Sequence, residues 1–197
     1  MITDAFPPEM DISGRLEVFS PGHRAEPSKV PCFCGPQGLL PFTTENRMPR
    51  HVHMSLAADG SKRYIVEKLH ILEGIALAEL GGKIYVIPPR TLVLIGPGVP
   101  HAWVACPPGL NLKRLNVVPE GEMEGGDDEY VSRGKFTAVY EYEEPTAFYP
   151  TAQTETLRSE DDYVACKDLQ SIRFPKMEIE DVIRDAFFVW GRTIRKF

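Results

Sequence analysis

The sequence lacks any uninterrupted run of about 18 apolar residues, the length that a helix needs to cross a bilayer. Its opening stretch, MITDAFPPEMDISG, has neither the basic start nor the apolar centre of a secretory signal peptide. Basic residues are too few for a broad nucleic-acid surface, because 22 lysines and arginines stand against 28 acidic residues. We therefore expect a cytoplasmic protein that binds neither membranes nor nucleic acids.

Cysteine is also sparse. The chain has four cysteines, and no two of them have the C-x-x-C spacing of a structural zinc site. Cys32 and Cys34 share one face of the extended segment PCFCG, where a disulfide between them would be strained. We expect all four, including Cys106 and Cys166, to be reduced thiols, as is usual in the cytosol.

Proline and glycine, in contrast, are plentiful, with 18 and 16 residues, which favours many short strands joined by turns. A chain of 197 residues with 43% hydrophobic content can bury one good core, so a single domain is expected. Residues 1–29 read as an N-terminal arm with one short strand candidate, RLEVF. Residues 30–142 carry the alternating patterns of an all-β sandwich or small barrel, and residues 143–197 form a C-terminal extension.

The extension ends in a segment with a different pattern, MEIEDVIRDAFFVWGRTIRKF. Its first turn is acidic and Gly191 precedes basic residues, as helix dipole and capping rules favour. The pattern predicts a helix near residues 178–190. Its aromatic side chains would cover apolar surface in the same subunit or across a dimer, and with the arm they favour a homodimer. The apolar positions at helical spacing are Ile179, Val182, Ile183, Ala186, Phe187 and Trp190.

The stretch MPRHVHMSL contains the most informative pair of residues. Side chains two positions apart on a strand point to the same face, so His51 and His53 would project together, with Val52 on the other side. Two imidazoles on one face provide half of a metal site.

The order of three stretches, HVH, then EKLHILEG, then GPGVPHAW, resembles the two signature motifs of the cupin superfamily. The resemblance covers residues 47–106 and implies an all-β fold, a single cupin jelly-roll β-barrel. It also implies that His51, His53 and Glu67 of the first motif bind a metal together with His101 of the second. One departure is clear, since thirteen residues separate His53 from Glu67 where the family has only a few.

The position of Glu67 depends on the turn inside this insertion, at Asp59-Gly60. A two-residue loop would pair position 52 with 67 and turn Glu67 away from the histidines. A three-residue loop over 58–60, with Gly60 left-handed, would pair 51 with 67 and place Glu67 on the histidine face. The two strands could also lie in different sheets. We predict that Glu67 points inward, within the 2.0–2.2 Å or so of a metal-bound carboxylate oxygen.

Three imidazoles and a carboxylate suit one divalent transition metal, Fe(II) first, with Mn, Ni, Cu or Zn as alternatives, and leave positions open for a small-molecule substrate. The similarity to cupin dioxygenases implies a non-haem metal dioxygenase acting on a small aromatic, phenolic or enolic compound, with Glu67 as general base. Two alternatives stay open. One is redox-neutral chemistry by an isomerase, decarboxylase or lyase, and the other is a metal- or ligand-binding protein without catalysis.

Other residues are weaker candidates for contacts with substrate. Trp103 shares a strand face with His101, and Arg47 has the parity of the two histidines and could bind a carboxylate or phenolate. Tyr85 and Arg114 could line the barrel, the latter on a strand predicted from LKRLNVV. His70 falls on the opposite strand face from Glu67, so we expect it to be an ordinary surface residue.

Overall fold

The computed structural model describes residues 16–19, 36–119, 127–191 and 193–197. The expectation for Cys32 and Cys34, and most of that for the N-terminal arm, lie outside these residues. The one strand predicted within the arm is present as β1 (Leu16–Phe19), which pairs antiparallel with β8 (Thr91–Ile95).

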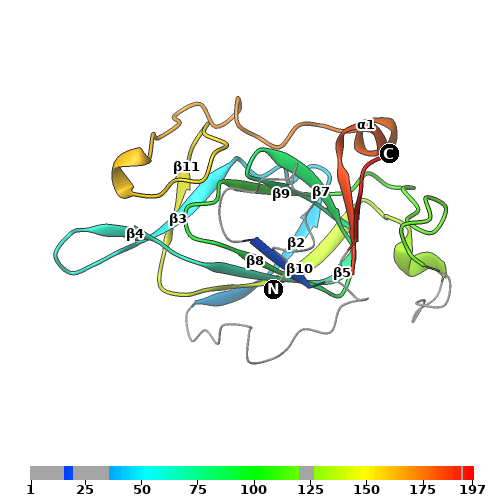
Figure 1. Cartoon of the computed structure of the whole chain (residues 1–197), viewed down its shortest axis with the longest axis horizontal. Helices are drawn as coiled ribbons and strands as arrows, with labels where there is room; N and C mark the ends of the chain where they lie inside the picture. The colour runs from blue at the N-terminus through cyan, green and yellow to red at the C-terminus, as the bar shows by residue number, and fades with distance from the viewer. Residues whose placement is uncertain (1–15, 20–35, 120–126, 192) are drawn as a thin grey trace.

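The described strands form two sheets that face each other (Figure 1). The five-stranded sheet has the order β1-β8-β5-β10-β2. The eight-stranded sheet has the order β11-β3-β9-β6-β7-β12-β13, with β4 paired to β3. The remaining strands of the first sheet are β2 (Gln37–Thr43), β5 (Glu67–Gly74) and β10 (Lys135–Tyr142). Those of the second are β3 (His51–Leu56), β4 (Lys62–Tyr64), β6 (Ala76–Leu80), β7 (Lys83–Ile87), β9 (His101–Ala105), β11 (Ala147–Pro150), β12 (Phe187–Trp190) and β13 (Thr193–Arg195).

This arrangement confirms the prediction of an all-β fold but not that of a closed barrel. The two sheets share no strand pairing in the described part of the chain, so they form a sandwich with open edges. The alternation of side chains along each strand sends every second residue into the space between the sheets. Phe136, Ala138 and Tyr140 of β10 lie there, as their parity predicts, against Trp103 of β9.

A second apolar cluster covers the outer face of the larger sheet. Leu77 and Val104 lie on this face and pack against side chains from the C-terminal extension, which crosses above the sheet in Figure 1. Phe174 and Phe188 are fully buried in this contact. Phe188 and Trp190 of the aromatic tail therefore cover apolar surface of their own subunit, and the homodimer stays a prediction.

The predicted helix at residues 178–190 is correct only in its first half. Helix α1 spans Ile179–Asp185, and the FFVW segment that follows is strand β12, parallel to β7 and antiparallel to β13. The spacing of apolar residues could not distinguish a helix from a strand here. The FFVW segment forms a strand because its aromatic and β-branched residues are more stable when they pair with the free edge of β7 than in a helix. Gly191, at φ 57°, turns the chain from β12 to β13 and does not cap a helix. No helix in the described ranges is long and apolar enough to cross a membrane.

The segment LKRLNVV, predicted as a strand, is a turn over residues 112–116. Asn116 adopts a left-handed backbone at φ 52°, which no strand accommodates. Leu112 and Val117 pack into the outer cluster, so the turn lies on the outside of the larger sheet. Arg114 is exposed there and does not line the space between the sheets.

The hairpin of β3 and β4 projects from one end of the sandwich (Figure 1). Met54 pairs with Tyr64 and Leu56 with Lys62, the register of the three-residue loop. Gly60 has the left-handed backbone that this loop needs, at φ 86°. After Tyr64 the chain leaves this sheet, and β5 begins at Glu67 in the other one. Glu67 therefore faces the histidines from across the sandwich.

We predict that Gly60→Ala lowers the free energy of unfolding by about 1 kcal/mol, because a Cβ at positive φ is strained even where space is free. No heavy atom lies within 4 Å of a Cβ built at this position, so the loss would be one of backbone conformation. Urea denaturation measures it. Gly60→Asn should lose less, since asparagine tolerates this region better. Equal stability of Gly60→Ala and wild type would contradict the left-handed assignment.

Candidate metal centre

Three histidines lie together at the end of the sandwich from which the hairpin projects. His51 and His53 come from β3, and His101 from the neighbouring β9, where it pairs directly with His51. All three are between 2% and 5% exposed, and their ligand atoms lie within 4.8 Å of one another. The three imidazoles are therefore close enough to hold a metal ion.

Backbone carbonyls fix the orientation of each ring. The Nδ1–H of His51 donates to the carbonyl of Pro49 at 2.9 Å, and that of His101 donates to Val99 at 2.9 Å. His53 makes the same contact with Ala147 at 3.3 Å. A neutral imidazole that donates from Nδ1 keeps an unprotonated Nε2, and metal-binding histidines characteristically use this arrangement. Two of these nitrogens, on His51 and His53, are only 3.2 Å apart.

Glu67 completes the group from the opposite sheet, as predicted. Its side chain is buried, with Oε2 2.9 Å from Nε2 of His101 and 3.7 Å from Nε2 of His53. In a neutral His101 the proton is on Nδ1, which donates to Val99, so Nε2 and the Glu67 carboxylate would both be acceptors. Neither atom has a hydrogen-bond partner among the described residues. Acceptors that converge in a buried space require a positive charge between them, from a proton or a metal ion.

The charge states of these groups at neutral pH are those that bind metals. Burial lowers the pKa of His51 well below its usual range, and the neighbouring His101 and His53 lower it further. Burial also lowers the pKa of His53, to about 4, although Glu67 opposes the shift. For Glu67, burial raises the pKa, but His101 and His53 outweigh it and the net direction is downward. The imidazoles of His51 and His53 are therefore neutral, and the carboxylate that faces them is ionised.

Two aromatic side chains border the histidines, and neither was among the predicted site residues. Phe148 of β11 stacks on His51, with ring centroids 3.8 Å apart and planes 19° apart, and it is 42% exposed. The ring of Tyr142 lies 4.5 Å from that of His53. Tyr142 could have been identified from the sequence, because it alternates with Phe136, Ala138 and Tyr140 on the inward face of β10. No local signal could have identified Phe148, because it reaches the site only through the pairing of β11 with β3.

Tyr85 and Trp103 point into the space between the sheets, in agreement with their parity. Their rings pack on Phe187 and Phe136, with centroid separations of 5.6 and 6.4 Å. Both are almost completely buried, so their surroundings are those of core aromatics. A contact with substrate stays a prediction for both residues.

Arg47 is not brought to the histidines. Its Nη1 donates to the carbonyl of Phe174 at 3.3 Å, and it lines a hollow of about 270 Å³ on the outer side of the larger sheet. Leu77 and Val104 line the same hollow, and both belong to the outer cluster. The strand that carries His51 does not extend back past the proline at position 49. Side chains therefore do not alternate regularly from Arg47 to His51, and Arg47 need not face the same way as the histidines.

Compared with protein-family models, curated proteins and solved structures, the chain gives no match. The resemblance to cupins therefore depends on the three sequence stretches alone.

Proposed function

We propose that this protein is a metal-dependent enzyme, a non-haem dioxygenase that acts on a small aromatic, phenolic or enolic compound. His51, His53, His101 and Glu67 would hold one divalent transition metal, with Fe(II) first among the candidates. One observation carries the proposal: three imidazole nitrogens and one carboxylate converge in a buried space, where Nε2 of His101 and Oε2 of Glu67 have no hydrogen-bond partner among the described residues.

The donor set fits such a metal, since imidazole and carboxylate are ligands of Fe, Mn, Ni, Cu and Zn alike. When bound, the metal would supply Lewis acidity and, for iron, the redox chemistry of O₂. The chain's own contribution is positioning and a proton acceptor. Carbonyl hydrogen bonds hold the imidazoles in place, and burial keeps bulk water away from the group. The Glu67 carboxylate, kept ionised by its histidine neighbours, can accept the proton of a substrate hydroxyl.

Oxygen uptake tests this proposal. Metal-free protein would be reconstituted with Fe(II) under anaerobic conditions and then mixed with catechols, flavonols and 1,3-diketones in an oxygen electrode. We expect uptake in step with product for at least one of these classes. Metal-free protein should show none, and His70→Ala, which changes an exposed histidine on the outer face of β5, should behave as wild type. Product formed without oxygen would favour the redox-neutral alternative, and metal binding without any product would favour a binding protein.

A further inference from the structure

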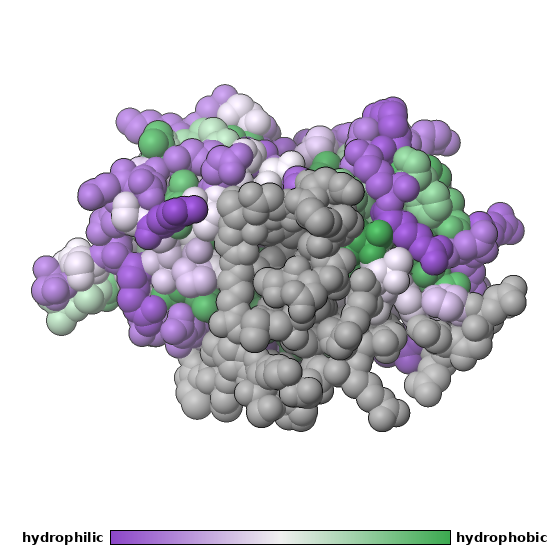
Figure 2. All heavy atoms as spheres, viewed as in Figure 1, coloured by the Kyte–Doolittle hydropathy of each residue, from purple (hydrophilic) through white to green (hydrophobic). Residues whose placement is uncertain are grey.

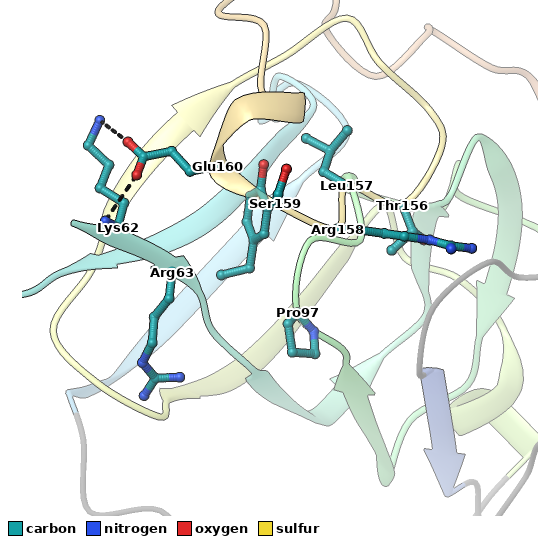
Figure 3. A pocket seen from close by; sticks show the side chains of 9 residues that line it. Lys62, Arg63, Pro97, Thr156, Leu157, Arg158, Ser159 and Glu160 are labelled. Atoms are coloured by element: carbon teal, nitrogen blue, oxygen red, sulfur yellow. Dashed lines mark hydrogen bonds and ion pairs between the residues drawn. The ribbon is translucent and has the colours of Figure 1, made fainter.

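A hollow of about 520 Å³ lies behind β3, on the side away from the histidines. Strand β4 provides Lys62, Arg63 and Tyr64, and the segment before the short 3-10 helix η4 (Glu160–Asp162) provides Leu157 and Arg158. Figure 3 shows these two segments on opposite sides of the hollow, with Pro97 below. Its size is that of a site for a small molecule.

The hydroxyl of Tyr64 is the first sign of a missing ligand. Tyr64 is 8% exposed and lines the hollow, and its hydroxyl is buried without a hydrogen-bond partner among the described residues. Burial raises the pKa of Tyr64 to about 12, with Asp162 contributing, so the hydroxyl is a donor at neutral pH. The Asp162 carboxylate accepts from the backbone N–H groups of Arg158 and Ser159 through Oδ2, and it makes no hydrogen bond with the Tyr64 hydroxyl. A buried hydroxyl without a partner is costly, and a ligand acceptor would remove the cost.

The charges around the hollow indicate an anion. Three of its lining residues are basic and one, Glu160, is acidic, in a chain whose net charge is −6. Glu160 pairs with Lys62 at 3.4 Å, the contact drawn in Figure 3, and Arg63 pairs with Glu144. In the described part of the chain, Arg158 belongs to no salt bridge, and the carboxylate that its charge reaches over a longer distance is that of Asp162. Figure 2 shows the surrounding surface as mainly hydrophilic.

The floor of the hollow is apolar and separates it from the histidines. Tyr64 and Leu157 pack with Val52 and Met54, two of the β3 residues that point away from the site. A molecule in the hollow would therefore lie on Tyr64 and Leu157, which pack against the back of the strand that carries His51 and His53, and would not reach the imidazoles.

We infer that this hollow is a second binding site, for a small aromatic carboxylate or aryl phosphate. The anionic group meets the Arg158 guanidinium, an oxygen of the ligand accepts from the Tyr64 hydroxyl, and the aromatic ring lies on Pro97 and Leu157. The inference does not depend on the metal centre.

Isothermal titration with benzoate and phenyl phosphate tests the site, with inorganic phosphate as the probe that lacks an apolar part. Metal-free protein carrying His101→Ala removes binding to a metal as an explanation. We expect one equivalent of phenyl phosphate to bind, at least about fivefold more tightly than inorganic phosphate, because the floor is apolar. Arg158→Ala should weaken it about tenfold. Arg184→Ala, at an exposed arginine of α1 that pairs with Asp181, should leave it unchanged. No binding, or equal binding to Arg158→Ala, overturns the inference.

Tyr64→Phe gives an independent measurement. If the hydroxyl has no partner, its removal should raise the melting temperature of the ligand-free protein and weaken phenyl phosphate about fivefold. A purely structural role for Tyr64 predicts the opposite sign, with a lower melting temperature in Tyr64→Phe. That outcome, or unchanged affinity, would overturn the assignment of Tyr64 to the site.

Discussion

Replacing His101 by alanine should remove nearly all bound metal from the protein, a loss of affinity of at least about a hundredfold. His101 is the only ligand expected from β9, and its imidazole connects the β3 pair to Glu67, at 2.9 Å from the carboxylate. Losing it removes a quarter of the donor set and leaves Glu67 facing a cavity. Losing a residue that binds the metal directly should lower metal affinity by more than the roughly 10- to 100-fold seen when a residue that only supports a ligand is replaced. Elemental analysis of the purified variant after dialysis measures the result.

The matched control is His70→Ala. His70 lies on β5, three residues from Glu67, but it faces outward and is exposed. This variant should keep close to one metal per chain, while His51→Ala and His53→Ala should lose it as His101→Ala does. Circular dichroism establishes that each variant is folded. Full metal content in folded His101→Ala would refute the proposed centre.

Changing Glu67 to glutamine should separate metal binding from stability, because the two effects have opposite signs. Glutamine keeps the shape of glutamate but replaces an anionic ligand with a neutral amide, so metal affinity should fall by about 10- to 100-fold, and turnover with it. In the metal-free protein the amide can donate to Nε2 of a neutral His101, so a neutral hydrogen bond replaces a buried pair that needs an extra proton between carboxylate and imidazole. The free energy of unfolding of metal-free Glu67→Gln should therefore equal that of wild type or exceed it by up to about 1 kcal/mol.

Metal titration and thermal melts with and without metal measure both effects. Glu73→Gln is the control, since Glu73 lies on the same strand but is exposed and accepts a hydrogen bond from Thr137 at the surface. It should change neither quantity. If Glu67→Gln binds metal as tightly as wild type, Glu67 is not a ligand, and the centre consists of three histidines without the proposed base.

The sequence by itself determined which side chains share a face of each strand, and in this way it placed the two histidines of β3 together. The spacing of His51 and His53 was enough to place both imidazoles on one face, because side chains on a strand alternate whatever the strand pairs with. The Asp59-Gly60 turn limited the register of β3 and β4 to two alternatives, and the structure has the one in which Gly60 is left-handed. In the β6–β7 hairpin, Gly81 and Gly82 both have positive φ and form the turn, and Leu80 pairs with Lys83.

Only the tertiary structure decided what lies against these faces. Strand β11, almost a hundred positions from β3 in sequence, brings the Ala147 carbonyl to His53 and the ring of Phe148 onto His51. The end of the chain became a strand and not a helix because the edge of β7 was free to pair with it. Glu67 lies opposite the histidines because the chain passes to the other sheet before β5 begins. The register of the hairpin alone could not show on which side Glu67 would lie. Alternation is a local property of the chain, whereas these contacts depend on the free energy of burying surfaces that are distant in sequence.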